Sequence, residues 1–112
     1  MTPVIDLAEL PVDRAVCALV EGEQVALVRT SDGGLYAVGN YDPIGRAMVM
    51  SRGVVGSRGG RDVLVSPLHK QAYDLTTGEC LDKDGYWLPV HEVRVVEGMV
   101  EVSVAVRQRV TA

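Results

Sequence analysis

The sequence predicts an all-β fold, an antiparallel β sandwich of two layers. We expect one domain over residues 1–112, with its core at about residues 15–106. Hydrophobic residues make up 47% of the 112 residues, which is enough for a buried core. Valine, whose branched side chain suits strands, recurs at alternate positions. No apolar stripe repeats with a helical period, so no long helix is expected.

The first half of the chain contains three strand-like segments. Residues 15–20 and 24–29 flank a turn that contains glycine, and residues 35–39 follow a second glycine turn. Before them, Asp6 could cap a single helical turn that Pro11 stops. An antiparallel meander of three short strands is therefore expected.

The second half predicts two hairpins. Residues 62–66, 72–75 and 79–81 form a small second-hairpin subdomain, with a Thr-Gly turn before the last segment. Residues 93–96 and 100–106, separated by a Glu-Gly turn, form the clearest hairpin because valines alternate with small or polar residues.

Charge and composition exclude several functions. The net charge is -4 and no dense run of basic residues occurs, which argues against nucleic acid as a partner. The longest apolar runs, such as residues 15–20, are too short to cross a bilayer, and the N-terminus lacks an export signal. Cys17 and Cys80 form no disulfide framework and are expected to be free thiols. We expect a cytoplasmic protein that binds neither membrane nor nucleic acid.

Two segments resemble the cluster loops of Rieske domains. The first is Asn-Tyr-Asp-Pro at residues 40–43, and the second runs from Ser-Pro-Leu-His at residues 66–69 to Leu75, with a Thr-Gly turn downstream. Rieske domains present Cys-x-His in the first loop and Cys-Pro-x-His in the second. The resemblance covers about residues 24–104 and implies a Rieske-like (ISP-type) antiparallel β sandwich.

The ligand positions implied by this resemblance are degenerate. A Rieske 2Fe-2S centre needs two thiolates and two imidazoles. The matching positions hold Asn40, Asp42, Ser66 and His69. The two cysteines lie elsewhere, so we expect neither a metal nor any other cofactor in this chain. His69 has two interpretations, a residual metal ligand or a polar bridge to Asp42 or to loop backbone.

Among Rieske-like proteins, the sequence is similar to the small subunit of assimilatory NAD(P)H-dependent nitrite reductase, through residues 38–43, 47–56, 65–75 and 78–81. This resemblance implies an accessory subunit of an oxidoreductase of nitrate assimilation and nitrogen metabolism. A separate large subunit would hold siroheme, a 4Fe-4S cluster, FAD and NAD(P)H, and would reduce nitrite to ammonium.

No catalytic residue is assigned to this chain, because no motif of an activated nucleophile is present. Two alternatives to the accessory subunit stay open. One is a stand-alone Rieske-like interaction module, and the other is an electron-transfer ferredoxin.

Two further features suggest partner binding. Residues 51–61 contain four glycines and are expected to be irregular and mobile; they also carry Arg52, Arg58 and Arg61. This segment is either a flexible hairpin tip or a docking arm whose arginines pair with carboxylates of a partner. Trp87 either covers the edge of the core or anchors an interface.

Overall fold

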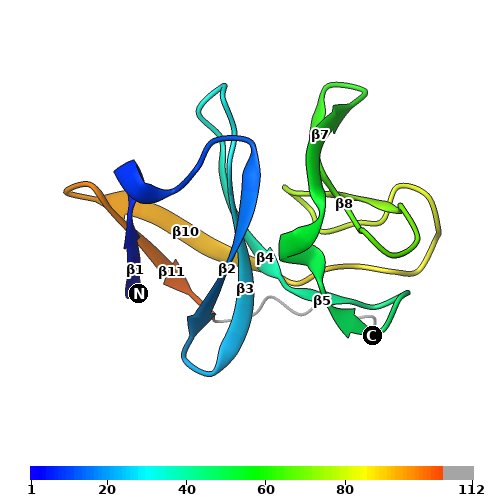
Figure 1. The fold of residues 1–112 in the computed structure, drawn as a ribbon, viewed down its shortest axis with the longest axis horizontal. Coiled ribbons are helices and arrows are strands. Elements are labelled where there is room, and N and C mark those ends of the chain that lie inside the picture. The colour runs from blue at the N-terminus through cyan, green and yellow to red at the C-terminus, as the bar shows by residue number, and fades with distance from the viewer. Residues whose placement is uncertain (105–112) are drawn as a thin grey trace.

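Strands dominate the architecture, and the predicted all-β fold is confirmed (Figure 1). The computed structural model describes residues 1–104. Within this range the helical elements are two single 3-10 turns, and neither is long or apolar enough to cross a membrane. The elements are β1 (Thr2–Asp6), η1 (Leu7–Glu9), β2 (Arg14–Val20), β3 (Glu23–Arg29), β4 (Leu35–Gly39), β5 (Tyr41–Asp42), β6 (Ala47–Met48), η2 (Met50–Arg52), β7 (Val54–Arg58), β8 (Arg61–Val65), β9 (Ala72–Asp74), β10 (Val90–Val96) and β11 (Met99–Ser103).

The largest sheet has six antiparallel strands in the order β1-β11-β10-β4-β3-β2. Strand β10 belongs to two parts of this sheet, because Val90 and His91 pair with β4 while residues 92–96 pair with β11. The sheet thus turns from one layer into the next along β10. A separate sheet, β7-β8-β9, lies on the other side of β2, β3 and β4. In Figure 1 three groups of strands stand side by side: β1 with β10 and β11, then β2 with β3 and β4, then the β7-β8-β9 sheet.

Strand β3 is buried on both faces. Val25 and Leu27 belong to a core with Val100 and Val102 of β11. Ala26 and Val28 point the opposite way, as alternate residues of a strand do. They pack in a second core with Met50, Leu64, Tyr73, Leu75, Cys80 and Leu88. The predicted sandwich therefore has a third layer, because an uninterrupted apolar run lets one strand serve two cores.

The segment expected to be irregular is instead a strand. Val54–Arg58 pairs in register with β8, from Val54 opposite Val65 to Arg58 opposite Arg61. Gly59 and Gly60 both have positive φ and form the two-residue turn between the strands. Gly56 weakened the strand pattern in the sequence, but the neighbouring strand supplies its hydrogen-bonding partners.

Three further segments differ from expectation or extend beyond the described residues. Strand β1 pairs with β11 and adds residues 2–6 to the sheet, ahead of the core boundary expected near residue 15. Residues 79–81 form no full strand; they make isolated bridges, Tyr73 with Cys80 and Glu79 with Trp87. The end of the strand predicted at residues 100–106 lies partly outside the described residues, within which β11 ends at Ser103.

Truncation of Leu27 should destabilise the fold. Its side chain is fully buried in the middle layer, so Leu27→Ala should lower the free energy of unfolding by about 2–5 kcal/mol through lost burial and a cavity. Leu19→Ala, on the adjacent strand and 73% exposed, should change it by less than about 0.5 kcal/mol. Urea unfolding of both variants is the measurement. Equal losses would contradict the placement of β3 between two cores.

Candidate functional site

The first loop, residues 40–46, is organised by the carboxylate of Asp42. This side chain is completely buried, and its Oδ1 accepts hydrogen bonds from the backbone N–H groups of Ile44 at 2.8 Å and Gly45 at 2.9 Å. The backbone N–H of Arg46 donates to the Asp42 carbonyl at 2.7 Å. An aspartate followed by such bonds is a common turn former. Asp42 thus folds the first loop over its own side chain.

The same carboxylate joins the first loop to the second loop, residues 66–71. The Ser66 hydroxyl donates to Asp42 Oδ2 at 2.5 Å, and the Tyr73 hydroxyl donates to Oδ1 at 3.3 Å. Ser66 and Tyr73 are also fully buried. The second loop closes on itself, because Ser66 N–H donates to the Gln71 carbonyl at 2.9 Å. Two of the four degenerate ligand positions are therefore bonded directly to each other.

These contacts set the electrostatics of the site. Burial alone would raise the pKa of Asp42, since a low dielectric disfavours the charged form. Hydrogen bonds from Ser66, Gly45, Ile44 and Tyr73 favour the carboxylate and outweigh burial, so the pKa of Asp42 lies below its usual value. The pKa of Tyr73 is raised by burial and by the Asp42 charge. At neutral pH the site holds a buried anion.

Asn40, the third position, secures the start of the first loop. Its side-chain amide donates to Gln24 Oε1 at 3.0 Å and lies 3.7 Å from Cys17 Sγ, while its Oδ1 accepts from the Ser51 N–H at 2.7 Å. The residue is 2% exposed. Asn40 therefore connects the loop to β3 and to the turn η2, and its polar atoms are already used.

His69, the fourth position, does not bridge the loops. Its side chain is exposed, and the bridge expected from this histidine is made by Ser66 instead. The backbone N–H of Lys70 donates to the Ser66 carbonyl at 3.1 Å, and this tight turn leaves His69 at the surface. Within residues 1–104 its ring has no hydrogen-bond partner.

The donor set does not fit a Rieske cluster. An amide, a carboxylate and a hydroxyl stand where two thiolates and one imidazole are required. The hydroxyl also donates its hydrogen bond to the carboxylate. In the part of the chain that the structure describes, no three His, Cys, Asp or Glu side chains are grouped so as to hold a metal ion.

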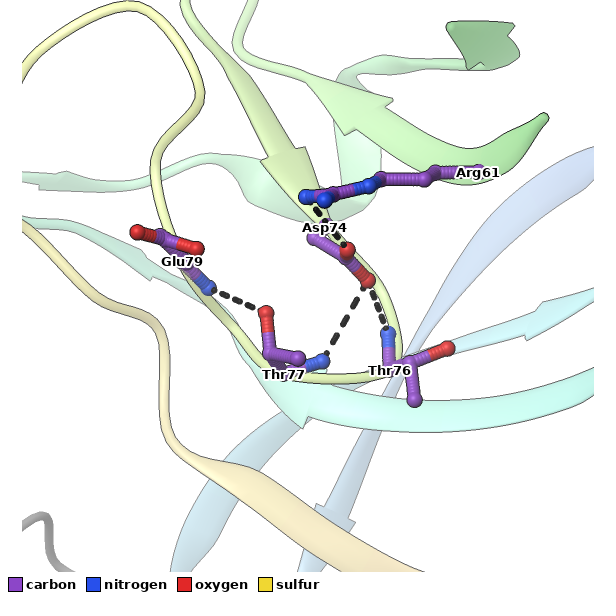
Figure 2. A network of polar contacts seen from close by, with 5 residues as sticks. All are labelled: Arg61, Asp74, Thr76, Thr77 and Glu79. Carbon is purple, nitrogen blue, oxygen red and sulfur yellow. Dashed lines mark hydrogen bonds and ion pairs between the residues drawn. The ribbon is translucent and has the colours of Figure 1, made fainter. Parts of the chain in front are cut away.

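A polar turn downstream of the second loop holds β9 in place (Figure 2). Asp74 Oδ1 accepts from the N–H groups of Thr76 at 2.7 Å and Thr77 at 3.3 Å, and Arg61 Nη1 lies 3.4 Å from Asp74 Oδ2. Gly78 has φ +81°, and a Cβ there would come within 2.0 Å of the Leu88 carbonyl oxygen. Only glycine fits this position.

The structure distributes the four predicted partner-binding residues among different surroundings. Arg58 makes a bidentate pair with Asp82, with distances of 2.6 and 3.1 Å, and Arg61 pairs with Asp74. Arg52 is exposed at the end of η2 and has no side-chain partner within the described range. Trp87 is half-buried. The three arginines therefore do not form one free basic arm.

Two supporting residues were not identified from the sequence. Gln24 accepts a hydrogen bond from Asn40, and Tyr73 donates one to Asp42. Each residue lies far from its partner in the chain, so no local pattern connects them. For Tyr73 a signal existed, since a tyrosine that is buried on a strand needs a partner for its hydroxyl. Gln24 gave none.

Comparison with known proteins places these loops in context. Residues 1–103 match the family model of the Rieske-like 2Fe-2S domain. The chain is 36% identical over 88 residues to the NADH nitrite reductase small subunit of Salmonella typhimurium, covering 78% of this chain and 82% of that protein. A crystal structure of a candidate NADH-dependent nitrite reductase small subunit from Mycobacterium tuberculosis has a TM-score of 0.87 and 47% identity, covering 90% of this chain and 91% of that one.

A larger protein also contains a similar segment. The chain is 34% identical over 100 residues to part of the NAD(P)H nitrite reductase large subunit of Klebsiella oxytoca. The match covers 89% of this chain and 10% of that protein.

Neutralising Asp42 should change the acid stability of the chain. A depressed folded pKa means that the contribution of the carboxylate is complete above its unfolded pKa of about 3.9 and is lost as the pH falls through the lower folded value. Asp42→Asn should lower the free energy of unfolding at neutral pH by about 1–3 kcal/mol. It should also flatten the fall in stability below about pH 4. Urea unfolding across this pH range measures both effects.

Asp84→Asn is the matched control, because Asp84 is an exposed carboxylate in the turn before Tyr86. It should retain the wild-type stability profile. If Asp42→Asn and Asp84→Asn gave the same profile, the assignment of a buried anion to Asp42 would be wrong.

Proposed function

The chain belongs to the nitrite reductase small-subunit family of Rieske-like proteins, and from this premise we propose that it is an accessory subunit that binds a separate large catalytic subunit. It carries no iron-sulfur cluster and contributes no catalytic residue. Reduction of nitrite to ammonium by NADH or NADPH takes place on the large subunit, in the cytoplasm. The siroheme, 4Fe-4S cluster and FAD implied by the resemblance belong to that subunit.

One observation carries the cluster-free part of this proposal. The hydrogen bond from Ser66 to Asp42 joins two of the positions that match cluster ligands in the resemblance to Rieske domains, which supports a chain without a cluster. Both side chains are buried, and both have further donors or acceptors. The loops are thus held together without iron. The same contact argues against the electron-transfer ferredoxin, which needs thiolate and imidazole ligands at these positions.

The large subunit of Klebsiella oxytoca supports the choice of partner. A segment similar to this chain makes up about a tenth of that protein. When a domain occurs as a separate chain in one organism and within a larger chain in another, the separate form is expected to associate with the remainder. This argument favours a large subunit over an unrelated partner for a stand-alone module.

Four exposed or half-buried residues remain a proposed contact set from the sequence, namely Arg52, Arg58, Arg61 and Trp87. Of these, Arg52 is the arginine without a side-chain partner in the described residues. Arg58 and Arg61 would exchange an internal carboxylate for one on the large subunit. Such an exchange gains little, since one ion pair replaces another.

Co-expression with the siroheme-containing large subunit tests the proposed function. The two chains should co-purify, and nitrite-dependent oxidation of NADH or NADPH should fall when this chain is omitted, because the large subunit then lacks its accessory partner. Pull-down and steady-state assay are the measurements. A large subunit that neither binds the chain nor changes its activity would overturn the proposal.

Metal content separates the accessory subunit from the ferredoxin. The purified chain should contain no stoichiometric iron or zinc, and His69→Ala should leave that content unchanged, because within residues 1–104 His69 belongs to no group of three potential metal ligands. Elemental analysis of both proteins is the measurement. Iron or zinc that is present in the wild type and lost with His69 would restore the metal-ligand interpretation.

A further inference from the structure

His91, on β10, is a buried histidine with an unused ring nitrogen. Its side chain is 5% exposed, and its Nδ1 has no hydrogen-bond partner within the described residues. Val93 packs against the core that contains Leu27 and Val100, whereas Val90 packs against the other core. Alternate residues of a strand share a face, so His91 points the same way as Val93. A titratable ring therefore points into an apolar core.

His91 also lies where the six-stranded sheet has its fewest paired residues. Strand β10 pairs with β4 at two positions, one of which is His91 opposite Ala37. It pairs with β11 at five positions, and β3 pairs with β4 at five. Pro89, just before β10, has no N–H to donate, although its carbonyl accepts from the Gly39 N–H at 2.9 Å. This short ladder, which we call the β4–β10 joint, is the place where the sheet should open most readily.

We propose that His91 is an acid-responsive switch whose protonation opens the β4–β10 joint. In the neutral imidazole one nitrogen carries no proton, and Nδ1 can take that role at little cost. The imidazolium carries a proton on both nitrogens, so Nδ1 would become a charged donor that faces apolar side chains. Burial of an unpaired charge costs far more than burial of an unbonded neutral group. When β10 separates from β4, water reaches the ring and the charged form is favoured.

The charged side chains around this core do not supply the missing partner. Those on the same face of the neighbouring strands are Arg14 at the start of β2 and Glu23 and Arg29 at the two ends of β3. Burial lowers the pKa of His91 and Glu23 raises it; burial has the larger effect, so the pKa lies below its ordinary value of 6.5. Arg29 donates to a backbone carbonyl of η1 at 2.9 Å, and Arg14 is exposed. Strands β1, β4 and β11 present apolar side chains to this core.

Opening should begin as the pH falls below about 6.5, the pKa of a solvated histidine. Above that value the ring is neutral in both forms, and the closed form has its full stability. Below it, the open form binds a proton that the closed form does not. The equilibrium constant for opening should then rise by up to about tenfold for each pH unit, until the pH passes the lower pKa of the closed form.

Amide hydrogen exchange of the purified full chain, from about pH 7.5 to about pH 5, measures this opening. After correction for intrinsic exchange rates, protection at residues 37–39 and 90–92 should fall with the pH, whereas protection in the β2–β3 ladder should not. His91→Leu removes the titratable group and suits an apolar core, so it should abolish the pH dependence. His91→Gln should do the same with a neutral polar side chain, and it replaces the first variant if that one does not fold.

His69→Gln is the matched control, because His69 is the other histidine of the chain and is exposed. It should keep the wild-type pH dependence of exchange. NMR titration of the wild-type imidazoles needs no variant, and the ring of His91 should titrate below pH 6.5. A titration of His91 at or above that value would overturn the proposal.

Three exchange results would also overturn it. Protection at the β4–β10 joint could be independent of pH in the wild type, or its pH dependence could survive in the His91 variants. Exchange could also accelerate equally in the joint and in the β2–β3 ladder, in which case acid would destabilise the whole fold and the joint would be no separate switch.

Discussion

A single buried carboxylate determines how the two loops sit. Asp42 lies beneath both, and its oxygens accept four hydrogen bonds, from Ile44, Gly45, Ser66 and Tyr73. Burying a charge is expensive unless such donors surround it, so the network is favourable only when it is complete. Displacement of either loop would leave the anion short of donors. In a Rieske domain metal-ligand bonds join the loops, whereas here an anion and a hydroxyl do so.

The strands that flank this site were largely predictable because their patterns are local. Residues 15–20, 24–29 and 35–39 were recognised from alternation and from glycine turns, and all three lie in observed strands. Strand β7 was missed because its glycines obscured the pattern, and its stability comes from pairing with β8. Strand β1 was missed because a five-residue segment at the terminus depends on β11, which lies about a hundred residues away.

The site was predictable in position but not in its bonding. The resemblance located Asn40, Asp42, Ser66 and His69, and three of them are indeed buried at the meeting point of the loops. The spacing of these residues in the sequence does not reveal which of them lies close enough to connect the two loops. Serine at the start of the second loop lies under it and reaches Asp42, whereas His69 follows the outward turn. His69 therefore keeps an imidazole at a ligand position although the groups around it are not those of a Rieske cluster.

A cation that already has an ion pair within the chain gains less from a partner's carboxylate than a cation without one. Arg58 already holds both carboxylate oxygens of Asp82, and Asp82 also accepts from the Ala72 N–H at 2.8 Å. Using Arg58 for a partner would break a contact that supports the start of β9. Arg46 and Lys70 have no such contact to lose within residues 1–104. Because a new ion pair contributes only what exceeds the pair it replaces, Arg46, Arg52 and Lys70, which have no ion pair within the described residues, would gain more from a partner's carboxylate than Arg58 would.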